Sequence, residues 1–343
     1  MPTARRSGRW EVTVLERSDS RPRGAAPAPT SPPPPPSASG PDPDLLAALA
    51  RACGVPALVC RPLPSGGTSR LWLLGTTAAG TAEGWPWIVK LHPDRCEVAA
   101  LRTLAPHAAA ARVPELVAAW ADPGAALCMT RRPGHTLARR LHAGAAIPLA
   151  ALAAAMAAVH AVPASGLPAD PEPAPWLAAQ CAVWPTGVAW AEAAVPRLRA
   201  LALRLPPRAP VLTHGAWFPR HVLVDRGAVT GLVDWSAARL ADPARDVASA
   251  VVGLFAEGVA GRAALALGAD LVRLYEAAAG RSLSAYGFHL LAAVAARAAG
   301  VGRRQAGPRD VPAAPAWNAL LSLCLEQLPP EAGGMPPAAG GTT

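Results

Sequence analysis

The sequence contains a single lysine, Lys90, within the apolar segment WPWIVKLHP at residues 85–93. Every other basic residue in the Lys+Arg total of 32 is an arginine. A lysine ammonium is a compact point charge on a flexible stem. Burial of an unpaired charge is very costly, so Lys90 needs an anion, and Glu97 is the nearest candidate along the chain. The alternative is an edge-strand lysine whose stem reaches water.

A second group of residues with chemical potential lies in VLTHGAWFPRHVLVDRGAVTGLVDWSAARLADPARDVA, residues 211–248. An apolar run leads into His214-Gly215, and a predicted hairpin with its turn at residues 225–227 ends near Asp234. A carboxylate at the end of an apolar strand is a suitable ligand for Mg²⁺ held against phosphate oxygens. Asp234 is therefore a candidate metal ligand.

Two flanking features have both structural and functional interpretations. The glycine-containing turn Ser65-Gly66-Gly67-Thr68-Ser69 lets the backbone approach a phosphate closely, although an ordinary hairpin turn has the same composition. Asp242 and Asp246 stand at a predicted helix start. We expect them to cap that helix and to tie down the His-Gly loop.

The elements that must position these residues fall into two groups, which predict an α+β fold with two lobes and a ligand cleft between them. A small β-rich lobe is predicted at residues 45–131, with one helix inserted near residue 97, and a larger helical lobe at 132–328. The proline-rich arm 1–44 and the tail 329–343 are predicted to be disordered. The predicted strands are ALVCRPL, RLWLLGT, PWIVKLH, ELVAAWA and AALCMTR, and the predicted helices of the second lobe are 147–162, 186–205, 244–260, 262–279, 285–301 and 313–328.

Composition narrows the class of protein and its partners. The formal net charge of +9 favours an anionic partner such as a nucleotide. A nucleic-acid partner is disfavoured because the chain has no recognition-helix signature and no dense basic stripe. The six cysteines form no CxxC pair, which indicates free thiols in a reducing cytoplasm. No signal peptide or membrane segment is expected, and the sequence indicates no particular protein partner.

The order of these features resembles the aminoglycoside phosphotransferase family, whose members have the protein-kinase-like fold and are related to choline and homoserine kinases. The resemblance implies ATP and Mg²⁺ as cofactors and transfer of the γ-phosphate to a hydroxyl of a small molecule. It implies that Lys90 contacts the phosphates and pairs with Glu97, and that Asp234 binds the metal. The other residues that it implies for nucleotide binding are Gly66, Gly67 and Ser69 in the turn, and Met129 and Arg131 in a connector at residues 128–131.

Two positions depart from the family pattern. The stretch reads HGAWFPRH where the family has HGDxxxxN, so that Ala216 replaces the general base and His221 replaces the second magnesium ligand. General-base catalysis typically contributes about 10²–10⁴-fold, while phosphoryl transfer depends mostly on positioning and charge neutralisation. Histidine is a poor substitute as a ligand because Mg²⁺ prefers oxygen. Three outcomes stay open: His221 is a replacement base, the enzyme is slow or substrate-assisted, or the chain is a nucleotide-binding pseudokinase that acts as a regulatory scaffold.

The acceptor is expected to be neutral or anionic, because a polycationic aminoglycoside needs several carboxylates for its ammonium groups. Residues 250–328 carry few acids and more arginines, although these arginines also suit a solvated face. The acids are Glu257, Asp270, Glu276, Asp310 and Glu326, and the arginines are Arg262, Arg273, Arg281, Arg297, Arg303, Arg304 and Arg309.

Overall fold

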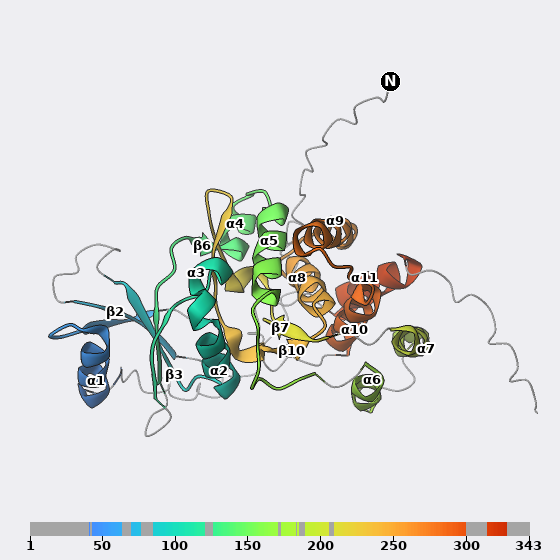
Figure 1. Cartoon of the computed structure of the whole chain (residues 1–343). Helices are drawn as coiled ribbons and strands as arrows, with labels where there is room; N and C mark the ends of the chain where they lie inside the picture. Colours follow the sequence, from blue (N-terminus) through green and yellow to red (C-terminus); the bar gives the residue numbers. More distant parts are fainter. Residues whose placement is uncertain are drawn as a thin grey trace, which may run out of the picture.

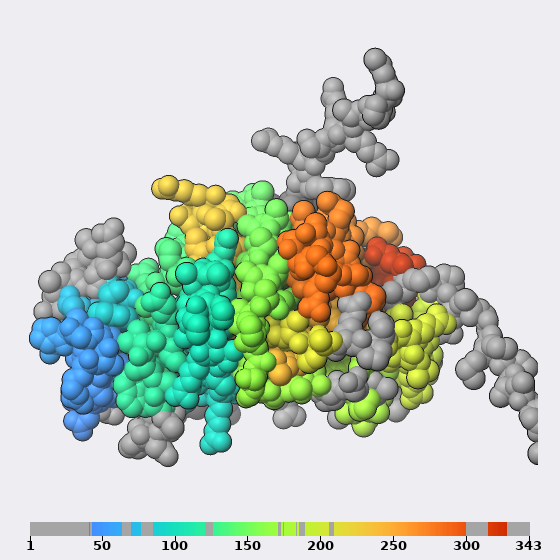
Figure 2. Space-filling view, in the orientation of Figure 1, coloured from blue at the N-terminus to red at the C-terminus, as the bar shows by residue number. Residues whose placement is uncertain are grey.

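Two lobes lie side by side along the long axis of the molecule (Figure 1). The space-filling view shows the blue residues of the N-terminal part at one end and the orange to red helices at the other (Figure 2). The computed structural model describes residues 41, 43–63, 70–76, 85–120, 126–170, 173–182, 184, 189–205, 209–299 and 314–327. Most of the predicted arm at 1–44 and the whole predicted tail at 329–343 lie outside the described residues.

The N-terminal lobe is built on a five-stranded antiparallel sheet in the order β1-β2-β3-β5-β4. The strands are β1 Val59–Leu63, β2 Arg70–Gly75, β3 Trp87–Leu91, β4 Leu116–Trp120 and β5 Ala126–Thr130. Lys90 lies on the central strand β3, opposite Leu71 and Leu127, and is 5% exposed. The edge-strand alternative for Lys90 is therefore wrong.

The two faces of this sheet are covered by different helices. Because side chains alternate along a strand, Val89 packs with Leu49 of helix α1, whereas its neighbour Lys90 meets Glu97 of helix α2. Helix α2 is capped by Asp94, whose carboxylate accepts a hydrogen bond from Cys96 N at 2.7 Å. The helices of this lobe are α1 Pro43–Cys53, α2 Arg95–Leu104, η2 Ala105–His107 and α3 Ala108–Ala111.

The connection between the lobes begins later than the sequence pattern predicts. The sequence predicts the connector at residues 128–131, but β5 continues through Thr130. Beyond the strand, Arg131 N still donates to Pro86 O at 2.7 Å. Met129 is thus a buried strand residue, because sheet pairing extends further than the apolar pattern indicates.

The C-terminal lobe is helical, and its predicted helices are present with ends shifted by a few residues. Two helices, α4 and α6, were not predicted, since both are short. The helices are α4 Leu137–His142, α5 Leu149–His160, α6 Pro173–Cys181, α7 Ala189–Arg204, α8 Ala244–Ala256, α9 Gly261–Ala279, α10 Tyr286–Ala298 and α11 Ala314–Gln327. Helix α8 packs between α9 and α10 in the centre of the lobe (Figure 1). None of the helices in the described part of the chain is long and apolar enough to cross a membrane.

Short strands cross this lobe where it meets the sheet. The predicted hairpin is formed by β8 and β9, and β6 pairs with β8. Strand β7 pairs with β10, which holds the start of the His-Gly loop against the chain that follows Asp234. These elements are β6 His135–Thr136, β7 Val211–Thr213, η3 Pro219–His221, β8 Val222–Asp225, β9 Ala228–Leu232, η4 Trp235–Ala237 and β10 Arg239–Ala241.

Candidate functional site

Lys90 joins the two lobes. Its Nζ lies 2.6 Å from Glu97 Oε2 and 3.1 Å from Asp234 Oδ1. Glu97 is 1% exposed, whereas the side chain of Asp234 is 39% exposed. The buried carboxylate thus anchors the ammonium, and the second carboxylate opens to solvent.

The charges at this contact stabilise one another. Burial alone would lower the pKa of Lys90, but the carboxylates of Glu97 and Asp234 outweigh this effect and raise it. Burial would raise the pKa of Asp234, but Lys90 and His221 outweigh it and lower that pKa to about 2. Asp234 is therefore ionised at neutral pH, as a metal ligand must be.

The backbone directs Asp234 toward Lys90. Asp234 has a left-handed conformation, with φ 64° and ψ 72°, directly after the β8–β9 hairpin and before η4. Aspartate tolerates this conformation better than most residues, but it is uncommon outside glycine. Ser236 Oγ donates to Asp234 Oδ1 at 3.0 Å and holds the carboxylate in place. The strained turn is what places the carboxylate at the lobe boundary.

The His-Gly loop is fixed by Asp246 at the start of α8. The Asp246 carboxylate accepts hydrogen bonds from the backbone N–H groups of His214 at 2.8 Å and Gly215 at 2.7 Å. It also accepts from Trp217 Nε1 at 2.9 Å and contacts His160 Nε2 at 3.0 Å. Asp242 Oδ1 accepts from Ala244 N at 2.8 Å and so holds the chain at the start of α8. The expected tie between Asp246 and the His-Gly loop is present, whereas the N-cap residue of α8 is Pro243, which makes no side-chain cap.

Gly215 permits a close approach that no other residue would. It has φ +75°, and a Cβ at this position would lie 2.2 Å from the carbonyl oxygen of Ala237. His214 adds two hydrogen bonds to this part of the loop. Its Nε2–H donates to Val233 O at 3.0 Å, and its Nδ1 accepts from Ala216 N at 3.3 Å. The ring of His214 is thus fully engaged in holding the loop beside Asp234.

His221 faces Asp234 from the end of the same loop. Its Nδ1 lies 2.9 Å from the carbonyl oxygen of Ala216, which can only accept, so Nδ1 carries the hydrogen. Nε2 then bears a lone pair and lies 3.5 Å from Asp234 Oδ2. Burial lowers the pKa of His221 to about 4, against the opposing charge of Asp234. The ring is therefore neutral at pH 7.

The residues at this site offer one good ligand for Mg²⁺ and one poor one. Asp234 fits, since Mg²⁺ is commonly held by one or two carboxylates together with substrate phosphates. His221 fits poorly, since Mg²⁺ prefers oxygen ligands. Within the described residues no group of three or more His, Cys, Asp or Glu side chains is arranged to hold a metal. A metal bound here would depend on phosphate oxygens to complete its ligands.

The remaining nucleotide-binding candidates are only partly described. Gly66, Gly67 and Ser69 lie outside the described residues. Met129 lies near the end of β5 and Arg131 directly after it, where the chain leaves the strand for the second lobe. Their contact with a nucleotide stays a prediction.

One buried hydrogen-bond network was not predicted from the sequence. Behind Asp246, His160 Nδ1 lies 2.8 Å from the hydroxyl of Tyr275. Both residues stand at ordinary positions on the apolar faces of α5 and α9, so helical spacing alone marks them as core. The one signal in the sequence for this network was His160, a histidine in the last turn of an otherwise apolar helix.

Comparisons with known proteins agree with this fold. Residues 59–286 match the model of the Phosphotransferase enzyme family. A variant of a thermostable mutant of aminoglycoside phosphotransferase APH(4)-Ia, in ternary complex with ADP and hygromycin B, is 18% identical with a TM-score of 0.56. That match covers 85% of this chain and 100% of that chain. A choline/ethanolamine kinase family protein from Mesorhizobium loti is 17% identical with a TM-score of 0.57, covering 83% of this chain and 93% of that chain.

A short stretch of sequence is more similar to another protein. Over 36 residues the chain is 56% identical to the protein YcbJ of Bacillus subtilis (strain 168). This match spans 10% of this chain and 12% of YcbJ. It is too short to describe either protein as a whole.

The β-sheet lobe, the helical lobe and the site between them define a protein of the kinase-like fold class. The chain belongs to the phosphotransferase enzyme family. The family resemblance and the fold predicted from the sequence are both confirmed.

Proposed function

We propose that this protein binds ATP with Mg²⁺ and transfers the γ-phosphate to a hydroxyl group of a small molecule. The observation that carries the proposal is the position of Lys90 between buried Glu97 and ionised Asp234. It supports binding of a metal-loaded polyphosphate, because one ammonium and one carboxylate are presented together at the lobe boundary. We further propose that the protein acts in a reducing cytoplasm, which suits its six free cysteines.

Each side chain has a separate role in this proposal. Glu97 orients the Lys90 ammonium, which supplies positive charge to phosphate oxygens. Asp234 would hold Mg²⁺, which when bound neutralises charge on the transferring phosphoryl group. Gly66, Gly67 and Ser69 would cover the phosphates, and Met129 and Arg131 would lie against the base.

A second candidate function is favoured by one specific observation. Ala216 occupies the position of the general base, and its methyl group cannot accept a proton from an acceptor hydroxyl. The loop around it is nevertheless fully anchored by Asp246. An intact loop without a base is the arrangement expected of a pseudokinase that binds nucleotide and acts through its lobe arrangement.

Nucleotide binding is tested first, by thermal unfolding with ATP and Mg²⁺. At a free ligand concentration of about 100 times Kd, binding stabilises the folded state by about 2.7 kcal/mol, which raises Tm by several degrees. We expect Lys90→Met to abolish this rise, since the phosphates lose their ammonium. Arg273→Gln, at an exposed position on α9, is the matched control and retains the rise. A wild-type protein whose Tm does not respond to ATP and Mg²⁺ contradicts both candidate functions.

Ala216→Asp then separates a working enzyme from an impaired one. A carboxylate restored at this position should raise phosphate transfer or ATP turnover by about 10²–10⁴-fold, the usual contribution of a positioned base. Nucleotide affinity should change little, because Ala216 contacts His221 within the His-Gly loop and does not contact Lys90. An unchanged rate in Ala216→Asp would show that the missing carboxylate does not limit the reaction.

A further inference from the structure

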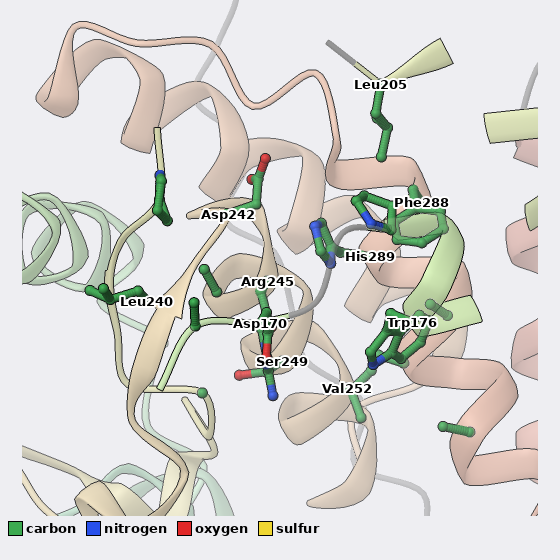
Figure 3. A pocket seen from close by; sticks show the side chains of 18 of the residues that line it. Asp170, Trp176, Leu205, Leu240, Asp242, Arg245, Ser249, Val252, Phe288 and His289 are labelled. Carbon is green, nitrogen blue, oxygen red and sulfur yellow. The ribbon is translucent and has the colours of Figure 1, made fainter. Parts of the chain in front are cut away.

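A cavity of about 390 Å³ lies in the C-terminal lobe, against the His-Gly loop. Figure 3 shows Trp176, Phe288 and His289 together on one side of this cavity, across from Leu240 and Asp242. Its volume is within the range of small-molecule sites. None of the residues proposed above to bind the nucleotide lines this cavity.

The cavity adjoins the position at which a phosphate acceptor would react. Gly215 and Phe218, which flank the general-base position Ala216, both line it. Leu240 and Ala241 line it from β10, the strand that follows Asp234 and η4. A molecule in this cavity would therefore lie next to the loop that carries the altered catalytic position.

The carboxylates of the cavity are already engaged. Asp170 accepts from Arg239 Nη1 at 2.9 Å and forms a second ion pair with Arg245. Asp242 accepts from Ala244 N at the start of α8. A polycationic ligand would have to displace one of these contacts to find a counter-charge.

Arg297, in contrast, brings a positive charge that the described residues do not balance. Its guanidinium lines the cavity and lies 5.1 Å from the ring centroid of Phe218, with no ion pair to any described carboxylate. Burial lowers the pKa of Arg297, and the neighbouring Arg220 lowers it further. Arg220 itself pairs with Glu257 at 3.3 Å. A half-buried guanidinium without an acid requires an anion for full stabilisation.

The walls supply flat apolar surface and one free hydrogen-bonding group. Trp176 and Phe288 meet edge to face with centroids 6.0 Å apart, and Phe288 and His289 do so at 5.2 Å. His289 Nε2 is shielded from solvent and has no hydrogen-bond partner among the described residues. An unpaired buried nitrogen costs free energy, so a ligand atom that bonds to it would gain affinity.

We infer that this cavity binds an acceptor with a flat aromatic body and a single carboxylate, the carboxylate pairing with Arg297 and the ring packing against Trp176 and Phe288. The role of this molecule as acceptor rests on the proposed phosphotransferase function. The site itself is defined by its own charge and shape, so its binding is measured without nucleotide.

Three probes of one shape and different charge test the inference by calorimetry. These are para-hydroxyphenylacetate, tyrosol and tyramine, which carry a negative, a neutral and a positive group on the same phenol. A charge-assisted hydrogen bond predicts that the anion binds about tenfold to a hundredfold more tightly than tyrosol. Tyramine should bind more weakly than either.

Two variants connect this preference to the residues named. Arg297→Gln should reduce the preference for the anion to within about threefold of tyrosol, because the amide keeps packing on Phe218 but lacks the charge. Arg297→Lys, which retains the charge, should keep a preference for the anion and guards against a folding defect in Arg297→Gln. Phe288→Leu should weaken all three probes alike, and Arg273→Gln, outside the cavity, should change none.

The outcomes distinguish this inference from the proposed function. Equal binding of the three probes, no binding of the anion, or an anion preference that survives in Arg297→Gln would overturn the inference, whatever the response to ATP. An Arg297-dependent anion preference supports it even if ATP and Mg²⁺ fail to raise Tm, in which case only the acceptor role is lost.

Discussion

His221 presents a neutral nitrogen to Asp234 where an oxygen would serve Mg²⁺ better. Its pKa of about 4 leaves little driving force for accepting a proton at pH 7. Its Nδ1–H is committed to the Ala216 carbonyl, so only Nε2 can act, and Nε2 faces the Asp234 carboxylate. The geometry therefore favours a poor metal ligand over a replacement base.

His221→Asn is predicted to strengthen Mg²⁺-dependent ATP binding by about tenfold, since the amide offers an oxygen in place of the imidazole nitrogen. Calorimetry of ATP binding, with and without Mg²⁺, measures the change. His142→Asn, whose side chain is 60% exposed, is the control. If instead His221→Ala lowers turnover by about 10²-fold or more at unchanged nucleotide affinity, His221 is the base after all.

At the scale of elements, the site depends on the junction of β7, the His-Gly loop and α8. Burial would raise the pKa of Asp246, but its contacts with His160 and the loop outweigh this and lower it. The ionised carboxylate can then accept from His214, Gly215 and Trp217 together. One side chain at a helix start thus sets the path of the whole loop.

Gly215→Ala is predicted to destabilise the fold by about 3 kcal/mol or more, because the new Cβ meets the Ala237 carbonyl and the loop must move. Gly227→Ala is the matched control. Gly227 has φ +81°, but a Cβ there meets nothing within 4 Å, so only the backbone strain of about 1 kcal/mol remains. Urea unfolding measures both. Equal losses of stability in the two variants would show that the close approach of Gly215 to the Ala237 carbonyl has no effect on stability.

Periodicity predicted the elements of this fold better than their connections. The strand containing Lys90 and the helix containing Glu97 follow from local alternation and helical spacing. Helix α6 was missed because Pro173 and Pro175 lie in its first turn and only nine residues follow the pattern. The connector was placed too early because backbone pairing, such as Arg131 N to Pro86 O, leaves no mark on side-chain type.

The candidate site was predictable where the residue types are unusual in their context. Lys90 in an apolar strand and Asp234 after an apolar hairpin stand out in this way. His160 and Arg297 do not, because one lies at the end of an apolar helix and the other among many arginines. Their importance comes from contacts between residues far apart in the chain, such as His160 with Asp246, and no local pattern encodes these.

At the scale of the whole molecule, the two lobes meet through charge, and the C-terminal lobe buries three histidines. Helix α2 packs on η4, so that the Lys90–Asp234 ion pair spans the boundary. Burial lowers the pKa of His214, and lowers those of His221 and His289 to about 4 each. All three histidines are neutral in the folded protein at neutral pH, whereas the unfolded chain protonates them near pH 6.5.

This difference predicts that stability falls as the solution becomes acidic. Between the folded pKa near 4 and the unfolded pKa near 6.5, the unfolded state binds more protons, so stability is full above pH 6.5 and declines toward pH 4. Each histidine contributes up to about 1.4 kcal/mol per pH unit. Urea unfolding at about pH 7.5, 6 and 5 measures the slope of the free energy of unfolding against pH. His289→Phe, which removes one of the three histidines, should flatten it, while His107→Gln at an exposed position should not. A slope that His289→Phe leaves unchanged, or stability that rises below pH 6.5, would mean that these rings do not stay neutral inside the fold.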